Sequence, residues 1–294
     1  MDERIVAAVD GSRPSRAALD WALERARRQH GLVTLVNVVE DTLGGTAPNV
    51  EARLARQAIN SLEAERARIE RESPELNITT ELAYGSILQT LKRISENCDL
   101  LVIGTHKNGI LKGTLLGSLG IRIAAAAACP VAVIPAPAPS GVNVVVGIDD
   151  TPESQAAGDF AAQEADATGS ELVMICAGYI ANPLFADLVP PVLPGKERAK
   201  ILARASERIQ RLFPAVSVQT RVVDGPPDEA LLDASLDARV LVVGHHHRST
   251  IVNLFGHSVA KDVLVGMAVP VIVVHDTTRR TDVVSSQPVA ETKP

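Results

Sequence analysis

The chain has 294 residues, of which 46% are hydrophobic but only 2% aromatic, and it carries a net charge of −6 at pH 7. This acidic balance argues against a nucleic-acid partner, because phosphate backbones are bound by basic surfaces. No apolar run is long enough to cross a membrane, and the charged N-terminus does not resemble a signal peptide. We therefore expect a cytoplasmic protein with no membrane contact.

Short apolar runs alternate with longer amphipathic stretches along the first half of the chain. Strands are predicted at residues 4–9, 32–38, 78–83, 100–103 and 131–134. Helices are predicted at residues 13–30, 50–72, 86–97 and 118–128. Ser12 fits the N-cap of the first helix, and Pro14 fits its first turn. Strands that alternate with helices form βαβ units, which predicts a parallel sheet covered by helices.

The second half repeats this order of elements. Its predicted strands are residues 143–148, 171–177, 216–223, 239–243 and 270–274. Its predicted helices are residues 152–168, 196–213, 227–236 and 258–267. The loop at residues 178–195 is longer than its counterpart, and a lid, a partner contact and a loosely packed surface loop are all compatible with its composition.

The two halves also share individual residues at a nearly constant spacing. The pairs are Asp10 with Asp149, 139 positions apart, and Gly85 with Gly225, Gly104 with Gly244 and Pro130 with Pro270, each 140 apart. So long a repeat indicates a duplicated domain rather than a solenoid of short units. We predict domains at residues 1–136 and 142–276, a stiff proline-rich linker between them, and a disordered tail at residues 277–294.

Charged and sulfur-containing residues give no further sign of a site. Arg and Glu alternate in residues 24–28 and 63–71, which is typical of solvated helix faces with local ion pairs. Cys98, Cys129 and Cys176 lie beside apolar runs and lack metal-ligand spacing. We expect them to be reduced thiols in the core.

The residues that point to a ligand lie where the predicted strands end. In an open parallel sheet, ligands bind beyond the carboxyl ends of the strands. Asp10 ends the first strand, and Gly104 ends the fourth and opens a loop that leads to Gly117 and Ser118 at a helix start. A helix N-terminus binds phosphate readily, and a carboxylate accepts hydrogen bonds from a nucleoside. The alternative is that Asp10 and Ser12 only cap the first helix.

Taken together, these motifs resemble the universal stress protein family over essentially the whole chain. The resemblance rests on Val-Asp-Gly-Ser after the first strand and Ile-Asp-Asp-Thr in the second half, the two glycine turns, the strand-four glycines, and the closing Cys-Pro-Val and Val-Pro-Val. It implies two flavodoxin-like, Rossmann-like domains, each with a five-stranded parallel sheet of order 3-2-1-4-5, packed as a pseudo-dimer through their last strands. Some members of this family bind ATP through Gly-x2-Gly-x9-Gly-Ser/Thr.

The first half departs from that motif at one position. It reads Gly104, Lys107, Gly117 and Ser118, so lysine replaces the second glycine. The resemblance implies ATP with Mg²⁺ in this cleft. Asp10 would hold the base or the ribose, and the Val38 backbone would contact the base. Gly104, Gly117 and Ser118 would surround the phosphates, with Lys107 as a point charge, and Ser12 is a further candidate site residue.

The second half departs further, because it reads Gly244, His247, His257 and Ser258. Asp149, Gly244 and Ser258 are its candidate site residues, and two imidazole rings stand where the motif has glycine. The run His245–His247 with His257 also raises the question of a transition-metal site. Consecutive residues rarely point at one ion, which favours ordinary loop histidines that titrate near neutral pH.

Three functions remain open. The first is a non-catalytic, cytoplasmic stress-response protein that binds an adenine nucleotide in its first half and hydrolyses it slowly at most. The second is an interaction protein with vestigial clefts, which acts through a protein partner or a homo-oligomer. The third, an ATP pyrophosphatase, would need a Ser-Gly-Gly-x-Asp-Ser loop, and Ala7-Ala-Val-Asp10-Gly-Ser12 lacks the paired glycines.

Overall fold

The computed structural model describes residues 2–40, 48–105, 116–137, 141–178, 193–245 and 258–275. The tail at 277–294 and most of the long loop at 178–195 lie outside these residues. The first half consists of β1 (Arg4–Ala8), α1 (Arg13–Gln29), β2 (Leu32–Val39), α2 (Pro48–Glu72), β3 (Asn77–Tyr84), α3 (Ile87–Ser95), β4 (Leu100–Thr105), α4 (Leu116–Ala126) and β5 (Val131–Pro135).

The second half follows the same plan. It consists of β6 (Asn143–Gly147), α5 (Pro152–Thr168), β7 (Leu172–Gly178), α6 (Gly195–Leu212), β8 (Val218–Asp224), α7 (Pro227–Ala234), β9 (Ala238–Gly244), α8 (Val259–Gly266) and β10 (Val271–Val274). The α/β fold that the sequence predicts is therefore confirmed, with element bounds within a few residues of those expected. The matched glycines Gly85 and Gly225 both have positive φ angles, +115° and +143°, which explains why each turn carries glycine.

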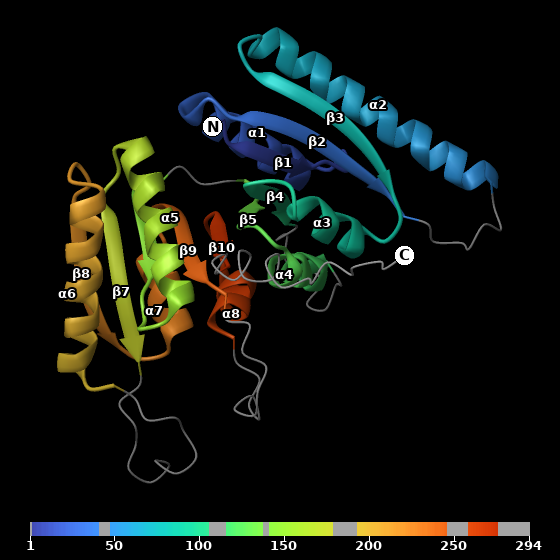
Figure 1. Ribbon diagram of the computed structural model, residues 1–294. Coiled ribbons are helices and arrows are strands. Elements are labelled where there is room, and N and C mark those ends of the chain that lie inside the picture. Colours follow the sequence, from blue (N-terminus) through green and yellow to red (C-terminus); the bar gives the residue numbers. More distant parts are fainter. Residues whose placement is uncertain are drawn as a thin grey trace, which may run out of the picture.

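All ten strands form one sheet, in the order β3-β2-β1-β4-β5-β10-β9-β6-β7-β8. Neighbouring strands are parallel within each half, whereas β5 and β10 pair antiparallel in the middle of the sheet (Figure 1). Ala132 lies opposite Ile272, and these two residues are 140 positions apart, like the other matched pairs. A pseudo-two-fold axis therefore passes between them, and the halves pack as a pseudo-dimer. This pairing removes two apolar sheet edges that would otherwise invite aggregation.

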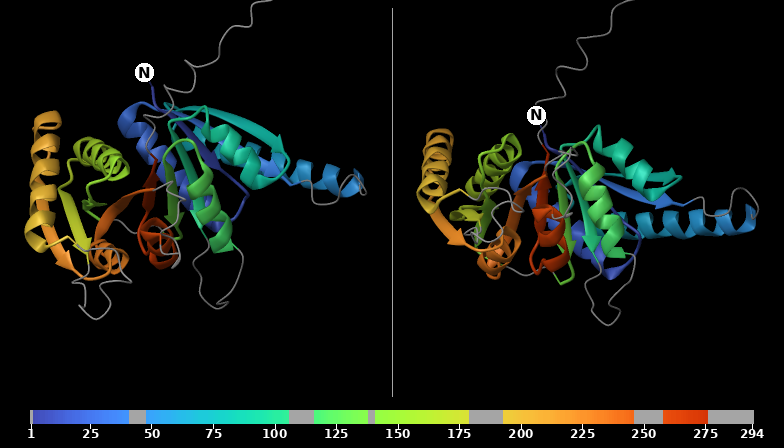
Figure 2. Two further views of the ribbon diagram at one scale, coloured as in Figure 1. Left: turned by 60° about the horizontal axis from the view of Figure 1, so that its bottom comes forward. Right: turned by 90° about the horizontal axis from the view of Figure 1, so that it is seen from below.

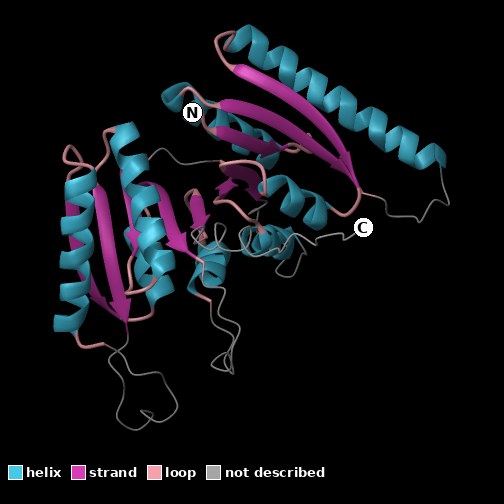
Figure 3. Ribbon diagram, in the orientation of Figure 1, coloured by secondary structure: helices cyan, strands magenta, loops and turns pink. Residues whose placement is uncertain are grey.

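Helices cover both faces of the sheet (Figures 2 and 3). One core layer lies under α1, α2, α5 and α6, and the other lies under α3, α4, α7 and α8. The strands are buried on both sides, so they read as continuous apolar runs rather than as alternating ones. The helices α2 and α6 run beside β3 and β8, the two outer strands (Figure 1). Across the pseudo-two-fold axis, α1 contacts α5 on one face and α4 contacts α8 on the other.

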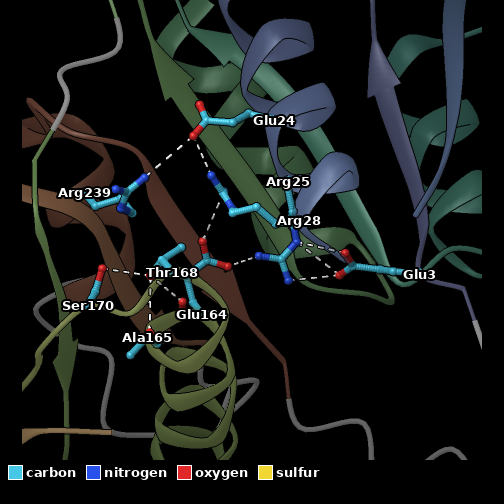
Figure 4. A network of polar contacts seen from close by, with 9 residues as sticks. All are labelled: Glu3, Glu24, Arg25, Arg28, Glu164, Ala165, Thr168, Ser170 and Arg239. Atoms are coloured by element: carbon cyan, nitrogen blue, oxygen red, sulfur yellow. Dashed lines mark hydrogen bonds and ion pairs between the residues drawn. The ribbon is translucent and has the colours of Figure 1, made fainter. Parts of the chain in front are cut away.

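A buried ion pair joins α1 to α5 (Figure 4). The side chains of Arg25 and Glu164 are only 2% and 1% exposed, and Arg25 Nη1 donates to Glu164 Oε2. Arg25 also donates to both oxygens of Glu3, at 3.0 Å from Nε and 3.0 Å from Nη2, and it packs over the Phe160 ring. Burial lowers the pKa of Arg25, but Glu164 and Glu3 raise it overall, so the guanidinium stays charged.

This finding corrects the expectation for residues 24–28. The interpretation of a solvated helix face holds for Arg66 and Glu70, which pair at 2.7 Å with both side chains half exposed, but not for Glu65, which is buried and bound by Arg16 and Arg68. It is wrong for Arg25, because α1 turns this residue toward the second half. Arg25 and Glu164 are 139 positions apart, so they occupy equivalent positions across the pseudo-two-fold axis.

The equivalent positions of Arg25 and Glu164 determine which halves of the protein can pair. If two copies of the first half paired in this way, two buried arginines would meet, and two copies of the second half would bring two glutamates together. Like charges in a water-poor interface cost several kcal/mol. The charges therefore favour pairing of unlike halves, which is the arrangement within one chain.

We predict that Glu164→Gln lowers the free energy of unfolding by about 3 kcal/mol, because it removes a buried charged partner of Arg25. The matched control is Glu70→Gln on the exposed face of α2, where the loss is expected to stay below about 0.5 kcal/mol. Urea unfolding of the two variants gives both values. Equal, small losses would show that the buried pair contributes nothing to joining the halves.

Candidate functional site

A cavity of about 140 Å³ opens at the C-terminal ends of β1, β2 and β4. Its walls are mainly apolar and include side chains of α3 and α4, on one face of the sheet. Four predicted site residues line it, namely Asp10, Ser12, Val38 and Gly104. Parallel strands that end together thus bring residues from three separate segments to one place, as the sequence predicts.

Asp10 lies at the mouth of this cavity, in an exposed turn that leads into α1. Its Oδ1 accepts a hydrogen bond from Ser12 N at 2.9 Å, and Ser12 Oγ accepts one from Ser15 N at 3.2 Å. Ser12 is therefore the N-cap of α1, as predicted. The carboxylate of Asp10 is oriented by the turn and held next to the cavity.

Gly104 has a clear packing role. A Cβ atom at this position would overlap the carbonyl of Pro14 and lie 2.7 Å from Ser15 N. Gly244 repeats this contact in the second half, where a Cβ would lie 2.7 Å from the Glu153 carbonyl carbon. In each half the strand-four glycine lets the first helix begin directly against the sheet, which places the aspartate turn at the strand ends.

The predicted phosphate-binding segment is described only in part. Helix α4 begins at Leu116, so the backbone of Gly117 and Ser118 lies in its first turn. The next turn of α4 supplies Leu119 and Gly120 to the cavity wall. Lys107 lies outside the described residues. The N-terminus of α4 therefore lies beside the cavity.

Several residues of the cavity were not predicted from the sequence. Asn37 and Ser15 line it, together with Ile87, Leu91 and Ile123. The apolar members have the spacing of ordinary core positions on α3 and α4, so nothing in the sequence separates them from the core. Asn37 gives a clearer signal, because it is an amide within a mainly apolar strand, and it is 8% exposed.

The second half keeps the turn but changes its surroundings. Asp149 Oδ1 accepts a hydrogen bond from Thr151 N at 3.0 Å, which matches the contact between Asp10 and Ser12. Ser258 is the N-cap of α8, and its Oγ accepts from Lys261 N at 3.5 Å. Cys176 stands 139 positions after Asn37, in the equivalent place. Burial raises the pKa of Cys176, so its thiol stays protonated at neutral pH.

The histidines and cysteines show no metal centre within the described residues, where no group of three His, Cys, Asp or Glu side chains could hold an ion. His246, His247 and His257 lie outside those residues. The ring of His245 packs edge-on against His275, with centroids 5.2 Å apart. All three cysteines are buried and free, as expected. No described helix has the length and apolarity needed to cross a membrane.

Comparisons with known proteins agree with this architecture. A sequence model of the Universal stress protein family matches residues 1–135 and again residues 142–275. Two universal stress proteins of Mycobacterium tuberculosis are 30% and 33% identical to this chain, each over 92% of it and over 96% and 94% of their own lengths. The crystal structure of a universal stress protein from Archaeoglobus fulgidus covers 93% of this chain and 98% of its own, with a TM-score of 0.71 and 17% identity. That last likeness concerns the fold.

We predict that Gly104→Ala and Gly244→Ala each lower the free energy of unfolding by about 1–3 kcal/mol, because the added methyl group overlaps the first turn of α1 or α5. Gly120→Ala is the control, since its Cβ would meet only Ile103 Cδ1 at 3.7 Å, and alanine stabilises a helix interior. Thermal or urea unfolding measures all three. A Gly104→Ala variant as stable as the parent would contradict the packing role.

Proposed function

Because the chain belongs to the universal stress protein family, we propose that it is a stress-response protein that binds an adenine nucleotide in its first half and catalyses no reaction. The observation that carries this proposal is the cavity at the ends of β1, β2 and β4, which has an apolar interior and a carboxylate at its mouth. An adenine nucleotide has the matching parts, namely a flat base and a polar ribose.

The size of the cavity supports a base as its occupant. Its volume of about 140 Å³ is close to the roughly 150 Å³ of an apolar cavity that takes up benzene. A whole nucleotide needs more space, so the ribose and the phosphates would lie outside, along the edge of the sheet. Asp10 would then accept hydrogen bonds from the ribose or the base, and the backbone of Val38 would contact the base.

The phosphates would lie at the N-terminus of α4. Gly117 and Ser118 belong to its first turn, where unpaired N–H groups and the helix dipole favour anions. Lys107 would add a flexible positive charge to this group. Mg²⁺ would arrive with the nucleotide, because it is usually held by phosphate oxygens and water with few protein ligands.

The second half lacks the features that favour phosphate. His247 and His257 stand where the family's motif has glycine, and their rings would fill space that the phosphates need. Near neutral pH an unperturbed imidazole is mostly uncharged, so it offers little compensation for a triphosphate. We therefore propose at most one tightly bound nucleotide per chain, in the first half.

Binding without catalysis follows from the residue types present. The sequence contains neither a Walker motif nor a nucleophile-elbow motif. Asp10, the carboxylate beside the cavity, is engaged by the amide of Ser12. A protein of this kind would act in the cytoplasm as a nucleotide-dependent binding partner of other proteins or of further copies of itself.

One observation favours the rival function, an interaction protein with vestigial clefts. Gly104 and Gly244 are both required by helix packing, so their presence does not depend on a ligand. The same holds for Ser12, which caps α1. Under this alternative neither half binds ATP, and the protein acts only through its surfaces.

Matched substitutions separate the two functions. Asp10→Ala removes one acceptor at the first cleft and is expected to weaken ATP binding by about 1–3 kcal/mol. Asp149→Ala removes the same contact to the backbone in the second half and is expected to leave ATP binding unchanged. Gly117→Val is expected to block the phosphates sterically. Titration calorimetry with ATP and Mg²⁺ measures all three variants.

Three outcomes would contradict the proposal in different ways. Equal binding by the parent, Asp10→Ala and Gly117→Val would refute the site. A loss of binding on Asp149→Ala alone would move the nucleotide to the second half. No heat signal from the parent at saturating ATP would favour the rival function.

A further inference from the structure

The second half contains a cavity on the opposite face of the sheet from α7 and α8. It has a volume of about 170 Å³ and lies between α5 and α6. We call it the α5–α6 cavity. Its interior is apolar, with walls formed by Ile148, Met174, Ile201, Ala205 and Ile209. Met174 and Ile209 are 0% and 1% exposed, so the cavity reaches into the core.

The first half provides an internal reference for this cavity, because α5 and α6 follow β6 and β7 as α1 and α2 follow β1 and β2. Arg68 pairs with Asp20 at 2.7 Å in the first half, and Arg208 pairs with Asp159 in the second. These ion pairs fix the correspondence, with an offset of 139 between α1 and α5 and of 140 between α2 and α6.

Two substitutions of large by small residues open the α5–α6 cavity. Gly158 occupies the position of Leu19, which is fully buried in the first half. Ala205 occupies the position of Glu65, which is 3% exposed and bound by Arg16 and Arg68 in the first half. Two large side chains that stand between α1 and α2 therefore have small counterparts at the α5–α6 cavity.

This opening costs stability. Glycine in a helix interior is less favourable than alanine, and a cavity adds a further loss. Two larger side chains compensate in part. Ile148 replaces Val9 and places its Cδ1 3.3 Å from where a Cβ of Gly158 would be, and Ile201 replaces Ser61, yet a cavity of about 170 Å³ remains. An apolar void that persists where the first half has larger side chains at two positions suits a bound molecule.

Charged groups surround the mouth of the α5–α6 cavity, and all of them are engaged by neighbouring groups of the protein. Asp149, Asp150, Arg204 and Arg208 line it, and Arg204 pairs with Asp150 at 3.2 Å. Arg208 is held by Asp159. Asp149 accepts a hydrogen bond from Thr151 N, so each charged group at the entrance already has a partner in the protein, and a ligand with a net charge gains no advantage. A neutral ligand can still form hydrogen bonds there.

We propose that the α5–α6 cavity binds a small neutral molecule that is mainly apolar and carries a hydrogen-bonding group at one end. The apolar part would enter between Met174 and Ile209, and the polar end would stay at the charged mouth. An apolar cavity of about 150 Å³ binds benzene, so the ligand is of about the size of benzene to indole. This site is separate from the nucleotide cleft and does not depend on it.

The experiment uses indole as the probe and the methyl groups of methionine as reporters. The chain has three methionines, so methyl-¹³C-methionine labelling of the full protein gives few resonances. Met174 lines the α5–α6 cavity, whereas Met267 is buried in the core layer on the other face of the sheet. We expect indole to shift the Met174 signal in a saturable way and to leave Met267 unchanged.

Variants that copy the first half test the location. Gly158→Leu combined with Ile148→Val restores Leu19 and Val9 at their equivalent positions, and Ala205→Glu separately restores Glu65. Both variants fill the cavity with side chains that this fold accommodates elsewhere, so either suffices if the other folds poorly. The control is Gln163→Ala on the exposed face of α5.

We expect both filled variants to lose the Met174 shift and the control to keep it. The proposal is overturned if the parent shows no saturable shift of Met174 up to the solubility limit of indole. It is also overturned if Met174 and Met267 shift together, or if a folded, filled variant binds indole like the parent. ATP binding plays no part in these outcomes, so they are independent of the nucleotide site.

Discussion

The rest of this molecule depends on the antiparallel pairing of β5 with β10. The buried ion pair of Arg25 and Glu164 joins the same two halves through α1 and α5. The strand pairing joins two parallel sheets into one and covers the apolar edge of each. The charges of Arg25 and Glu164 distinguish this arrangement from a pair of identical halves, because these two residues occupy equivalent positions and carry opposite charges. A buried ion pair is weak evidence for stability, but it is a recognised means of selecting a partner.

Because this contact fixes how the halves pack, residues away from it can differ between the two halves without changing the fold. The first half keeps an apolar cavity beside Asp10 at the ends of its strands. In the second half, histidines replace motif glycines, and a different cavity opens between α5 and α6 where Gly158 replaces a buried leucine. Residues needed for packing are the same in both halves; for example, Gly104 and Gly244 each allow a helix to begin directly against the sheet. The two halves thus differ in the sites they offer while sharing one fold.

Much of the fold was predictable from sequence, because the repeat shows each helix and strand twice. The hydrophobic patterns and the residues that cap the helices indicate the same elements in both halves. The turn at Asp10 and the N-cap at Ser12 were predictable for the same reason. The burial of Arg25 was not, although it follows Ala22 by one helical turn on the buried side of α1, since its partner comes from the other half. Likewise, Gly158 is plain in the sequence, but only packing against α6 shows that it opens a cavity. Local sequence patterns identify helices, strands and caps. Contacts between distant segments decide whether a polar residue is buried or a glycine opens a cavity.

We propose that this chain is an asymmetric pair of domains with one nucleotide site. The most direct measurement is native mass spectrometry of the full-length protein titrated with ATP and Mg²⁺, together with identification of any nucleotide released from protein purified without added ATP. We predict one adenine nucleotide per 31.1 kDa chain at saturation. Two nucleotides per chain would contradict the asymmetry, and none at saturating ATP would contradict nucleotide binding itself.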